Sequence, residues 1–310
     1  MIDYTVLGGY LGAGKTTLLN HLLNNAAQTR YALLINDFGA INIDAGLIES
    51  ETDQQINLAN GCVCCNLSDG FYEALESLQK MRPVPEHIIV EASGVADVHN
   101  LGQYGFGHDL NLTGIVVVVD AETIRAKADD RYVAQTIRRQ LRSADILVVN
   151  KVDLVQDGQL EDLKAWLRTH NPQAALVSAI HGRVPVAVLT GIGPGPQAEN
   201  AHKHPAHENY ASWHFESPES FTEEQVETFV ERLGSDVLRC KGLVKCRRGG
   251  VIEVQCVGAR RETTWHAARA VQTSQLVAIG VAEQFRASKL DELICECGLS
   301  DQVDSEPEHP

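Results

Sequence analysis

The stretch Gly9-Tyr10-Leu11-Gly12-Ala13-Gly14-Lys15-Thr16 decides the fold, because it lies between an apolar run at 5–7 and a helical pattern at 16–25. A glycine-rich turn between strand and helix that ends in Gly-Lys-Thr is the context of a phosphate-binding loop. Its glycines let backbone N–H groups turn toward a phosphate, and the helix adds the positive end of its dipole. We expect Lys15 to reach the β and γ phosphates of a nucleotide and the Thr16 hydroxyl to ligate Mg²⁺. The expected phosphate-binding residues are Gly9, Gly12, Ala13, Gly14, Lys15, Thr16 and Thr17.

Short apolar runs alternate with helical patterns through the first 180 residues, as in βαβ units whose strands are buried on both faces. Strands are expected at 5–7, 32–35, 87–90, 115–119, 146–149 and 174–177. Helices are expected at 16–25, 68–81, 132–142 and 159–170. The predicted fold class is therefore α/β, with the doubly wound, mostly parallel sheet of a P-loop NTPase.

The residues Asn150-Lys151-Val152-Asp153 follow an apolar strand, at the sheet edge where such a fold binds its ligands. They resemble the N-K-x-D motif by which GTPases select guanine. The Asp153 carboxylate can accept hydrogen bonds from the guanine ring N–H and exocyclic amine, which adenine does not offer, while Asn150 and the Lys151 stem frame the ring. The pair Ser178-Ala179 resembles a second loop that touches guanine. These residues predict GTP rather than ATP as the nucleotide.

Between these two motifs, the apolar strand at 87–90 leads into Glu91-Ala92-Ser93-Gly94. The spacing resembles a D-x-x-G switch in which the acid orients the Mg²⁺ shell and the glycine N–H senses the γ phosphate. Glu91 would take the place of the acid and Gly94 that of the sensor. Lys15, Thr16, Glu91 and Gly94 are thus the expected catalytic residues, with Thr16 and Glu91 as Mg²⁺ ligands.

Three of the eight cysteines are packed into Gly61-Cys62-Val63-Cys64-Cys65. Two or three thiolates at this spacing can bind one soft or borderline ion, with Zn–S distances of about 2.3 Å for zinc, and a fourth ligand must come from elsewhere. The candidate fourth ligands are Asp37, Asp44, His99 or a side chain of a partner. An incomplete protein shell suits a carrier that has to release its ion. The alternative is that the cysteines pack under a switch loop or form a redox pair.

Composition excludes several classes of function. The 310 residues carry 26 Lys and Arg against 41 Asp and Glu, and the formal net charge of −15 disfavours binding to a nucleic-acid backbone. The longest strongly apolar run, at 115–119, is too short to span a bilayer, and the first four residues lack the features of a signal peptide. We therefore expect a cytoplasmic protein with no membrane or nucleic-acid partner.

The length favours two domains. We expect a P-loop GTPase domain at 1–190, a linker rich in Gly, Pro and His at 191–209, a smaller α+β domain at 210–300 and a disordered tail at 301–310. The second domain should contain a helix at 222–233, strands at 242–247, 251–257 and 263–266, and a last helix after residue 285. Cys295 and Cys297 should point to different faces of that helix and serve in packing.

Together these motifs resemble the CobW-like branch of the metal-handling P-loop GTPases. The resemblance rests on Gly12 to Thr17, Asn36-Asp37-Phe38-Gly39, Gly61 to Cys65, Glu91 to Gly94, Asn150 to Asp153 and Val237 to Gly242, and so spans nearly the whole chain. It implies slow GTP hydrolysis coupled to handling of a transition metal, often zinc, or cobalt for corrinoid synthesis.

The chain departs from the family pattern in two places. Asp37 stands where the family usually has Glu, and Ala40 where a second acid is common, so a metal role of Asp37 is less secure. The linker carries only His202, His204 and His207, with His214 further on, in place of a long His-rich stretch. These imidazoles could collect zinc weakly or simply belong to a solvated linker.

The resulting hypothesis is a metallochaperone whose cysteine segment lies among the nucleotide switches, so that nucleotide state sets metal affinity. The second domain, with basic Arg239, Lys241, Arg247 and Arg248, would recognise the client protein or close over the switches. Whether the chain forms a homodimer stays open. Two alternatives remain: a cobalt- or iron-handling GTPase that supports cobalamin synthesis or metalloenzyme activation, and a regulatory GTPase with structural cysteines.

Overall fold

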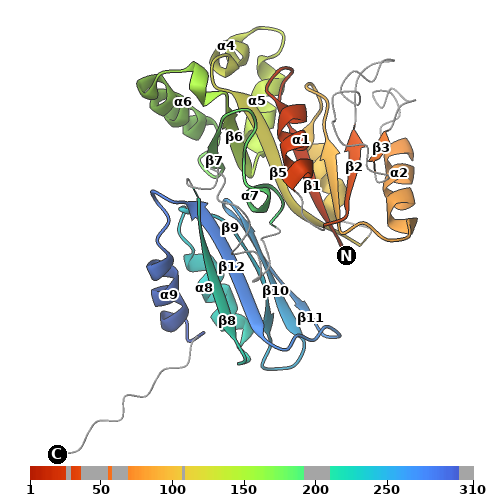
Figure 1. Ribbon diagram of the computed structural model, residues 1–310, viewed down its shortest axis with the longest axis vertical. Coiled ribbons are helices and arrows are strands. Elements are labelled where there is room, and N and C mark those ends of the chain that lie inside the picture. Colours follow the sequence, from red (N-terminus) through yellow and green to blue (C-terminus); the bar gives the residue numbers. More distant parts are fainter. Residues whose placement is uncertain (26–28, 36–54, 58–68, 107–108, 192–209, 300–310) are drawn as a thin grey trace, which may run out of the picture. The chain divides into compact units, whose positions relative to one another are not determined.

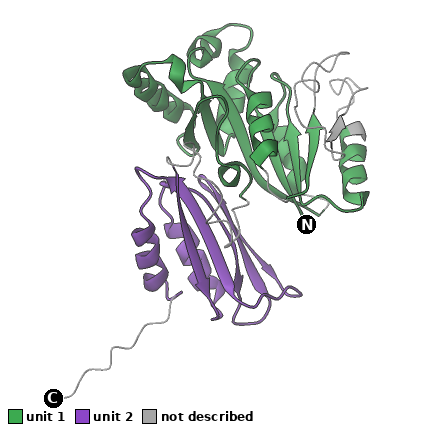
Figure 2. Cartoon of the chain, viewed as in Figure 1, with its two compact units in different colours: residues 1–192 green, residues 193–310 purple. Residues whose placement is uncertain are grey.

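The computed structural model describes residues 1–25, 29–35, 55–57, 69–106, 109–191 and 210–299. The chain forms two compact units, residues 1–192 and residues 193–310, which Figure 2 shows in different colours.

The first unit is built on a parallel β-sheet. In chain order its strands are β1 (Ile2–Gly8), β2 (Tyr31–Ile35), β3 (Gln55–Asn57), β4 (His87–Glu91), β5 (Leu110–Asp120), β6 (Ile146–Asn150) and β7 (Ala175–Ala179). Their order across the sheet is β3-β2-β4-β1-β5-β6-β7, and each neighbouring pair is parallel. The predicted doubly wound parallel sheet is confirmed, with β1 at its centre (Figure 1).

The helices of this unit cover both faces of the sheet because the chain reverses its direction across the sheet after β3. They are α1 (Lys15–Asn25), α2 (Asp69–Lys80), α3 (Val98–Gln103), α4 (Ile124–Asp129), α5 (Ala134–Ser143), α6 (Asp157–His170) and α7 (Val186–Thr190). The step from β1 to β2 runs one way across the sheet, whereas the steps from β3 to β4 and from β4 through to β7 run the other way. Right-handed crossovers therefore place α1 on one face and α2 to α6 on the other (Figure 1).

The main core lies between the sheet and α2 to α6. Strand residues such as Val117 and Leu147 pack there with Phe71 of α2, Ile137 of α5 and Leu167 of α6, all at most 1% exposed. Runs of Val and Ile form strands buried on both faces because their branched side chains suit a pleated surface that is covered on each side.

All six predicted strands and all four predicted helices of the first unit are present. The sequence reasoning did not predict β3, α3, α4 or α7, which have three to six residues each. Elements this short show less than two turns or two repeats of any hydrophobic period, so the periodic signal is too weak to read.

The second unit is an antiparallel sheet with two helices. Its strands are β8 (Tyr210–Ser217), β9 (Val237–Lys245), β10 (Val251–Val257), β11 (Arg260–His266) and β12 (Ser274–Val281), in the order β11-β10-β9-β12-β8. The helices are α8 (Glu223–Arg232) and α9 (Ala287–Glu296). Phe229 of α8 and Leu293 of α9 share one core with Trp213 and Val254 of the sheet. The predicted α+β class is confirmed, whereas β8 and β12 were not predicted.

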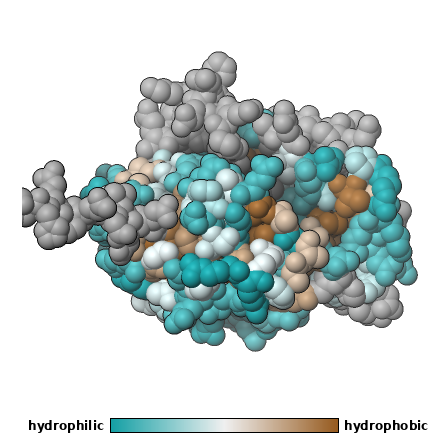
Figure 3. Space-filling view, turned by 90° about the horizontal axis from the view of Figure 1, so that it is seen from below, coloured by the Kyte–Doolittle hydropathy of each residue, from teal (hydrophilic) through white to brown (hydrophobic). Residues whose placement is uncertain are grey.

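In the part of the chain that the structure describes, no helix is long and apolar enough to cross a bilayer. On the face seen in Figure 3, hydrophilic residues predominate and hydrophobic ones occur in separate small areas.

Candidate nucleotide-binding site

The P-loop (residues 9–16) connects the carboxyl end of β1 to α1, at the centre of the sheet edge. The side chain of Lys15 is 9% exposed and its Nζ donates a hydrogen bond to the Gly9 carbonyl, 3.0 Å away. The Ala13 N–H donates to the Tyr10 carbonyl at 3.1 Å, and the first helical bond runs from Leu18 N–H to the Gly14 carbonyl at 3.0 Å. The loop thus closes around its own lysine and leads directly into α1, as the motif predicts.

Gly14 lies close to the Asn150 side chain at the end of β6. Its φ of 102° favours glycine, and a Cβ there would lie 2.3 Å from Nδ2 of Asn150. The loop can therefore pass this close to β6 only because residue 14 has no side chain.

Asn150 joins the P-loop to the loop after β7. It is the last residue of β6 and is 2% exposed. Its Nδ2 donates to the Ala13 carbonyl at 2.9 Å, and its Oδ1 accepts from the Gly182 N–H at 2.9 Å. One buried amide thus fixes the distance between the predicted phosphate site and the predicted base site.

Lys151 is oriented by a carboxylate that the sequence reasoning missed. Lys151 has left-handed backbone angles, φ 63° and ψ 36°, and its Nζ lies 2.7 Å from Oδ2 of Asp120 at the end of β5. The other oxygen of Asp120 accepts the N–H groups of Glu122 and Thr123 at 3.0 and 3.2 Å. Burial raises the pKa of Asp120, but Lys151 and these two N–H groups outweigh it, so the pKa lies below its usual range and the carboxylate is ionised.

The residues of the predicted guanine site lie around this amide and ion pair. Asp153 is exposed, as an acceptor for a base from solvent must be, and Leu154 beside it is 56% exposed. Ala179 ends β7 directly opposite Asn150 in the register, with Ser178 exposed before it and Ile180, 43% exposed, after it. Leu154 and Ile180 are thus exposed apolar side chains next in the chain to Asp153 and Ala179, of the kind on which a purine ring can pack.

Glu91 and Gly94 lie on the other side of the P-loop. Glu91 is 3% exposed at the end of β4, in register with Leu7 of β1 and Ile35 of β2. A Cβ on Gly94 would lie 2.7 Å from Cγ and 2.8 Å from the backbone nitrogen of Leu11, so the loop after β4 is in tight contact with the P-loop. The structure thus places Gly94 against the P-loop and Glu91 at the same edge of the sheet.

A glycine-rich loop, a buried acid and an Asn-Lys-x-Asp segment meet at one sheet edge, and the comparison with known families agrees. Residues 3–178 match the family of the CobW/HypB/UreG nucleotide-binding domain. The chain belongs to this family. Residues 210–298 match the C-terminal domain of the cobalamin synthesis protein cobW.

Three relatives illustrate the family. The zinc chaperone CobW of Sinorhizobium sp is 29% identical over 340 residues, covering 93% of this chain and 95% of the relative. The zinc chaperone CobW of Pseudomonas aeruginosa is 30% identical over 289 residues, covering 78% and 76%. The crystal structure of the Zn(II)-bound YjiA GTPase from E. coli is 22% identical with a TM-score of 0.47, covering 97% of this chain and 99% of that one.

In this member of the CobW/HypB/UreG family, sequence reasoning missed two buried residues at the site. Asp120 directly follows a predicted strand, so an acid at a carboxyl strand end was the available signal. Gln140 of α5 is 2% exposed, and its Nε2 donates to the Gly94 carbonyl at 3.2 Å and the Ala96 carbonyl at 3.1 Å. A glutamine on a helix carries no comparable signal in a single sequence.

Most of the predicted metal site lies outside the described residues. This concerns Asp37, Asp44, Cys62, Cys64, Cys65, His202, His204 and His207. His99 is exposed on α3, with its Nε2 3.1 Å from Nε2 of Gln103. Within the described ranges, no group of three or more His, Cys, Asp or Glu side chains could hold a metal ion. In the chain, β2 precedes the segment that contains Asp37, and β3 precedes the segment that contains the three cysteines. The ends of both strands lie at the same sheet edge as Glu91.

The structure corrects two expectations about the second unit. Arg239 is 3% exposed within β9, so it cannot bind a client at the surface, whereas Arg247 and Arg248 are exposed. Cys295 and Cys297 do point to different faces of the C-terminal helix region, but only Cys297 is buried and packs in the core. Cys295 is exposed, and the prediction that it serves in packing is wrong. A spacing of two residues puts two helical side chains on different faces, but it does not show which of the faces is buried.

Proposed function

We propose that this protein is a GTP-hydrolysing metallochaperone that binds a transition metal, zinc in the first place, and transfers it to a client metalloprotein under nucleotide control. The observation that carries the nucleotide part is the Asn150 amide, which ties the P-loop to the base site. The metal part rests on the relatives named zinc chaperones and on the Cys62-Val63-Cys64-Cys65 segment.

Guanine recognition is proposed for Asp153, with Asn150, Lys151, Ser178 and Ala179 around the base. An exposed carboxylate can accept from both N–H groups on the guanine edge, whereas adenine presents an acceptor and would leave the carboxylate opposed by a lone pair. The ion pair with Asp120 keeps the Lys151 stem in one orientation beside the ring. The specificity of the site thus comes from charge and donor pattern rather than from shape.

For hydrolysis we assign the phosphates to the P-loop, with Lys15 as the cation that neutralises charge on them. Mg²⁺, supplied with the nucleotide, fits the Thr16 hydroxyl and the buried Glu91 carboxylate, since oxygen is its preferred ligand atom. Gly94 is the proposed sensor of the γ phosphate, because its loop contacts the P-loop at Leu11. We expect slow intrinsic turnover, which suits a switch that a partner completes.

Nucleotide control of the metal follows in this proposal from chain order. The cysteine segment comes between β3 and α2, and β3 ends at the sheet edge beside β2 and Glu91. Cys62, Cys64 and Cys65 are the proposed metal ligands, with Asp37 as a further candidate. A ligand segment joined to the switch edge would let GTP change metal affinity, and by linkage metal would change GTP affinity by the same factor.

The deciding experiment is a zinc titration of the reduced protein against a competing chelator, in GDP and in a non-hydrolysable GTP analogue with Mg²⁺. We expect the two affinities to differ by about tenfold or more, equivalent to about 1.4 kcal/mol of coupling. Cys64→Ser with Cys65→Ser should abolish the high-affinity site, and Cys295→Ser, at an exposed cysteine of α9, is the matched control. Unchanged zinc affinity in the folded double variant would refute the assignment of the metal site.

Cobalt is the second candidate cargo, because the second unit matches a domain of a cobalamin synthesis protein. The same titration with Co²⁺ decides between the two ions. We assign recognition of the client to the second unit, through its exposed Arg247 and Arg248. Dimerisation is a separate proposal, which sedimentation in GDP and in the GTP analogue would test.

A further inference from the structure

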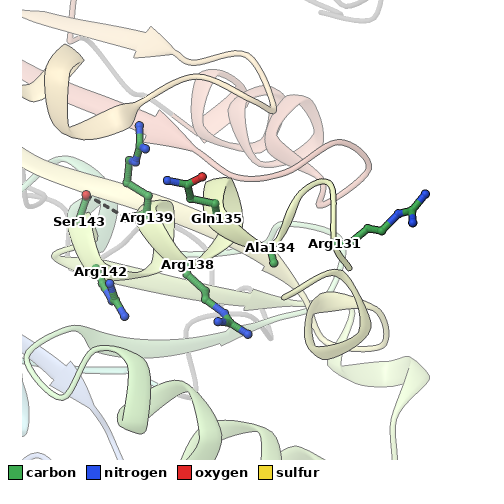
Figure 4. Close-up of a pocket in the computed structure, with 7 residues that line it drawn as sticks. All are labelled: Arg131, Ala134, Gln135, Arg138, Arg139, Arg142 and Ser143. Atoms are coloured by element: carbon green, nitrogen blue, oxygen red, sulfur yellow. Dashed lines mark hydrogen bonds between the residues drawn. The ribbon is translucent and has the colours of Figure 1, made fainter. Parts of the chain in front are cut away.

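The outward side of α5 carries a concentration of arginine in a chain that is acidic as a whole. Arg131, just before the helix, and Arg138, Arg139 and Arg142 line a hollow of about 500 Å³, together with Ala134, Gln135 and Ser143 (Figure 4). We call Arg131, Arg138 and Arg142 the arginine face, since Arg139 extends to the other side of α5 (Figure 4). The helix itself, AQTIRRQLRS, contains no Asp or Glu. A formal charge of −15 for the chain thus coexists with a local surface of the opposite sign.

Among the residues that the structure describes, Asp129 is the one acid that forms a salt bridge with the arginine face. Arg138 Nη2 lies 3.4 Å from Oδ1 of Asp129, with both side chains well exposed at 46% and 77%. Arg142 makes no salt bridge to any residue that the structure describes. Arg138 and Arg142 extend on the same side of α5 in Figure 4, one helical turn apart. Like charges at that spacing destabilise a helix, so the arrangement does not serve stability.

The inward side of the same helix holds the loop that contains Gly94. Gln140 donates to the Gly94 and Ala96 carbonyls, as described above. Arg139 Nη1 lies 3.0 Å from Oδ2 of Asp97, whose other oxygen caps α3 by accepting the N–H groups of His99 and Asn100. A change in the position of α5 is thus transmitted to the loop after β4 through two independent contacts.

The chemistry of the arginine face selects its partner. Guanidinium groups bind carboxylates in a fork geometry that ammonium groups cannot offer. A helix of ten residues is about 15 Å long, which matches an extended peptide of about four or five residues rather than a single small anion. The seven residues that line the hollow include no aromatic side chain on which a base could stack, which opposes a single-stranded nucleic acid as the partner.

We propose that the arginine face docks an acidic segment of a partner protein, and that this docking is coupled to the Gly94 loop. The coupling rests on the proposed function, in which Gly94 senses the γ phosphate. The docking does not, since it needs only the charges and the hollow.

The test of docking is made on the full chain without nucleotide, by fluorescence anisotropy of a labelled decapeptide of alternating Asp and Glu. A decapeptide of Asn and Gln is the reference, and we expect the acidic peptide to bind at least about tenfold more tightly. Arg138→Glu with Arg142→Glu should weaken binding by at least about tenfold. The matched control, Arg168→Glu with Arg286→Glu, changes the net charge equally at exposed arginines elsewhere and should change affinity by less than about twofold. Arg142→Gln serves if the double reversal fails to fold.

Equal losses in the two double variants would mean a non-specific charge effect and would overturn the docking site. Displacement of the peptide by a single-stranded RNA of equal charge at lower concentration would also overturn it, in favour of a nucleic-acid surface. The coupling is tested by repeating the titration in GDP and in the GTP analogue, where we expect the peptide affinities to differ, and the difference to vanish in Gln140→Met. Nucleotide binding is measured in parallel, so absent coupling with intact GTP binding refutes the coupling alone, whereas absent GTP binding refutes the proposed function.

Discussion

Replacement of Asn150 by alanine tests the idea that one buried amide joins the phosphate site to the base site. The change deletes the bonds to the Ala13 carbonyl and from the Gly182 N–H, both 2.9 Å long. The Ala13 carbonyl and the Gly182 N–H are then left buried without this partner, at about 1–3 kcal/mol each, so we expect a loss of about 2–6 kcal/mol in the free energy of unfolding. Because the P-loop loses its anchor, GDP affinity should fall by about tenfold or more in the molecules that remain folded.

The first unit supplies a matched control in Asn171, a second buried asparagine at the opposite edge of the sheet. Its Nδ2 donates to the carbonyls of Leu141, Arg142 and Ala144 at 2.8, 3.3 and 2.9 Å, and its Oδ1 accepts from the N–H groups of Gln173 and Ala174. Asn171→Ala should destabilise the unit at least as much as Asn150→Ala while leaving GDP affinity unchanged. Urea denaturation followed by circular dichroism, and titration with a fluorescent GDP analogue, measure the two quantities. Wild-type GDP affinity in folded Asn150→Ala, or equal affinity losses in the two variants, would refute the reasoning.

Three further substitutions test other contacts of the site. Asp153→Asn should reduce the preference for GTP over ATP by at least about tenfold, because the amide presents a donor toward the guanine N–H groups. Competition between the two nucleotides measures this preference. An unchanged ratio of GTP to ATP affinity would rule out the guanine assignment. Gly94→Ala should weaken binding of the GTP analogue more than that of GDP, since its Cβ would lie 2.8 Å from the Leu11 nitrogen; equal effects on both nucleotides would argue against a sensor. Asp120→Asn should cost about 1–2 kcal/mol at pH 7 through loss of the 2.7 Å ion pair with Lys151. Because the pKa of Asp120 is lowered on folding, the stability advantage of the wild type should be complete above the ordinary carboxyl pKa of about 4 and be lost as the pH falls further. Unfolding curves recorded from about pH 7 to about pH 3 measure this dependence. A stability advantage that does not change with pH would contradict the ion pair.

The candidate nucleotide site could be proposed from the sequence because its residues occur in short contiguous motifs with fixed spacing. Gly14, Lys15 and Asn150 occupy the positions that the motifs predict, since the parallel sheet brings the carboxyl ends of β1 and β6 to one edge. The contact between Ala13 and Asn150 spans 137 positions, yet each partner is recognisable by itself. A short motif is enough to identify each partner where the topology of the sheet brings the two partners together.

The same reasoning failed where a residue acts through a partner that carries no motif. Gln140 is a polar residue on the buried side of a helix, and nothing in a single sequence distinguishes it from a solvated one. Strand β12 reads Ser-Gln-Leu-Val-Ala-Ile-Gly-Val, an apolar run without turn signals of its own, and it gains its identity from pairing with β8 and β9. The sequence predicts Arg239 at the surface and the structure buries it, because burial of a charge depends on the unit that encloses it, which the sequence does not show.

The hydrogen bond from the Gly182 N–H to Asn150 determines where the chain can be truncated without loss of the candidate nucleotide site. The guanine motifs end at Ala179, and the family match of the first unit ends at residue 178. A fragment cut at either point would keep nearly every recognisable motif and yet remove the donor that holds the Asn150 amide in its orientation. The smallest autonomous nucleotide-binding fragment should therefore extend beyond residue 182, so its boundary is set by a backbone hydrogen bond that no motif search would find.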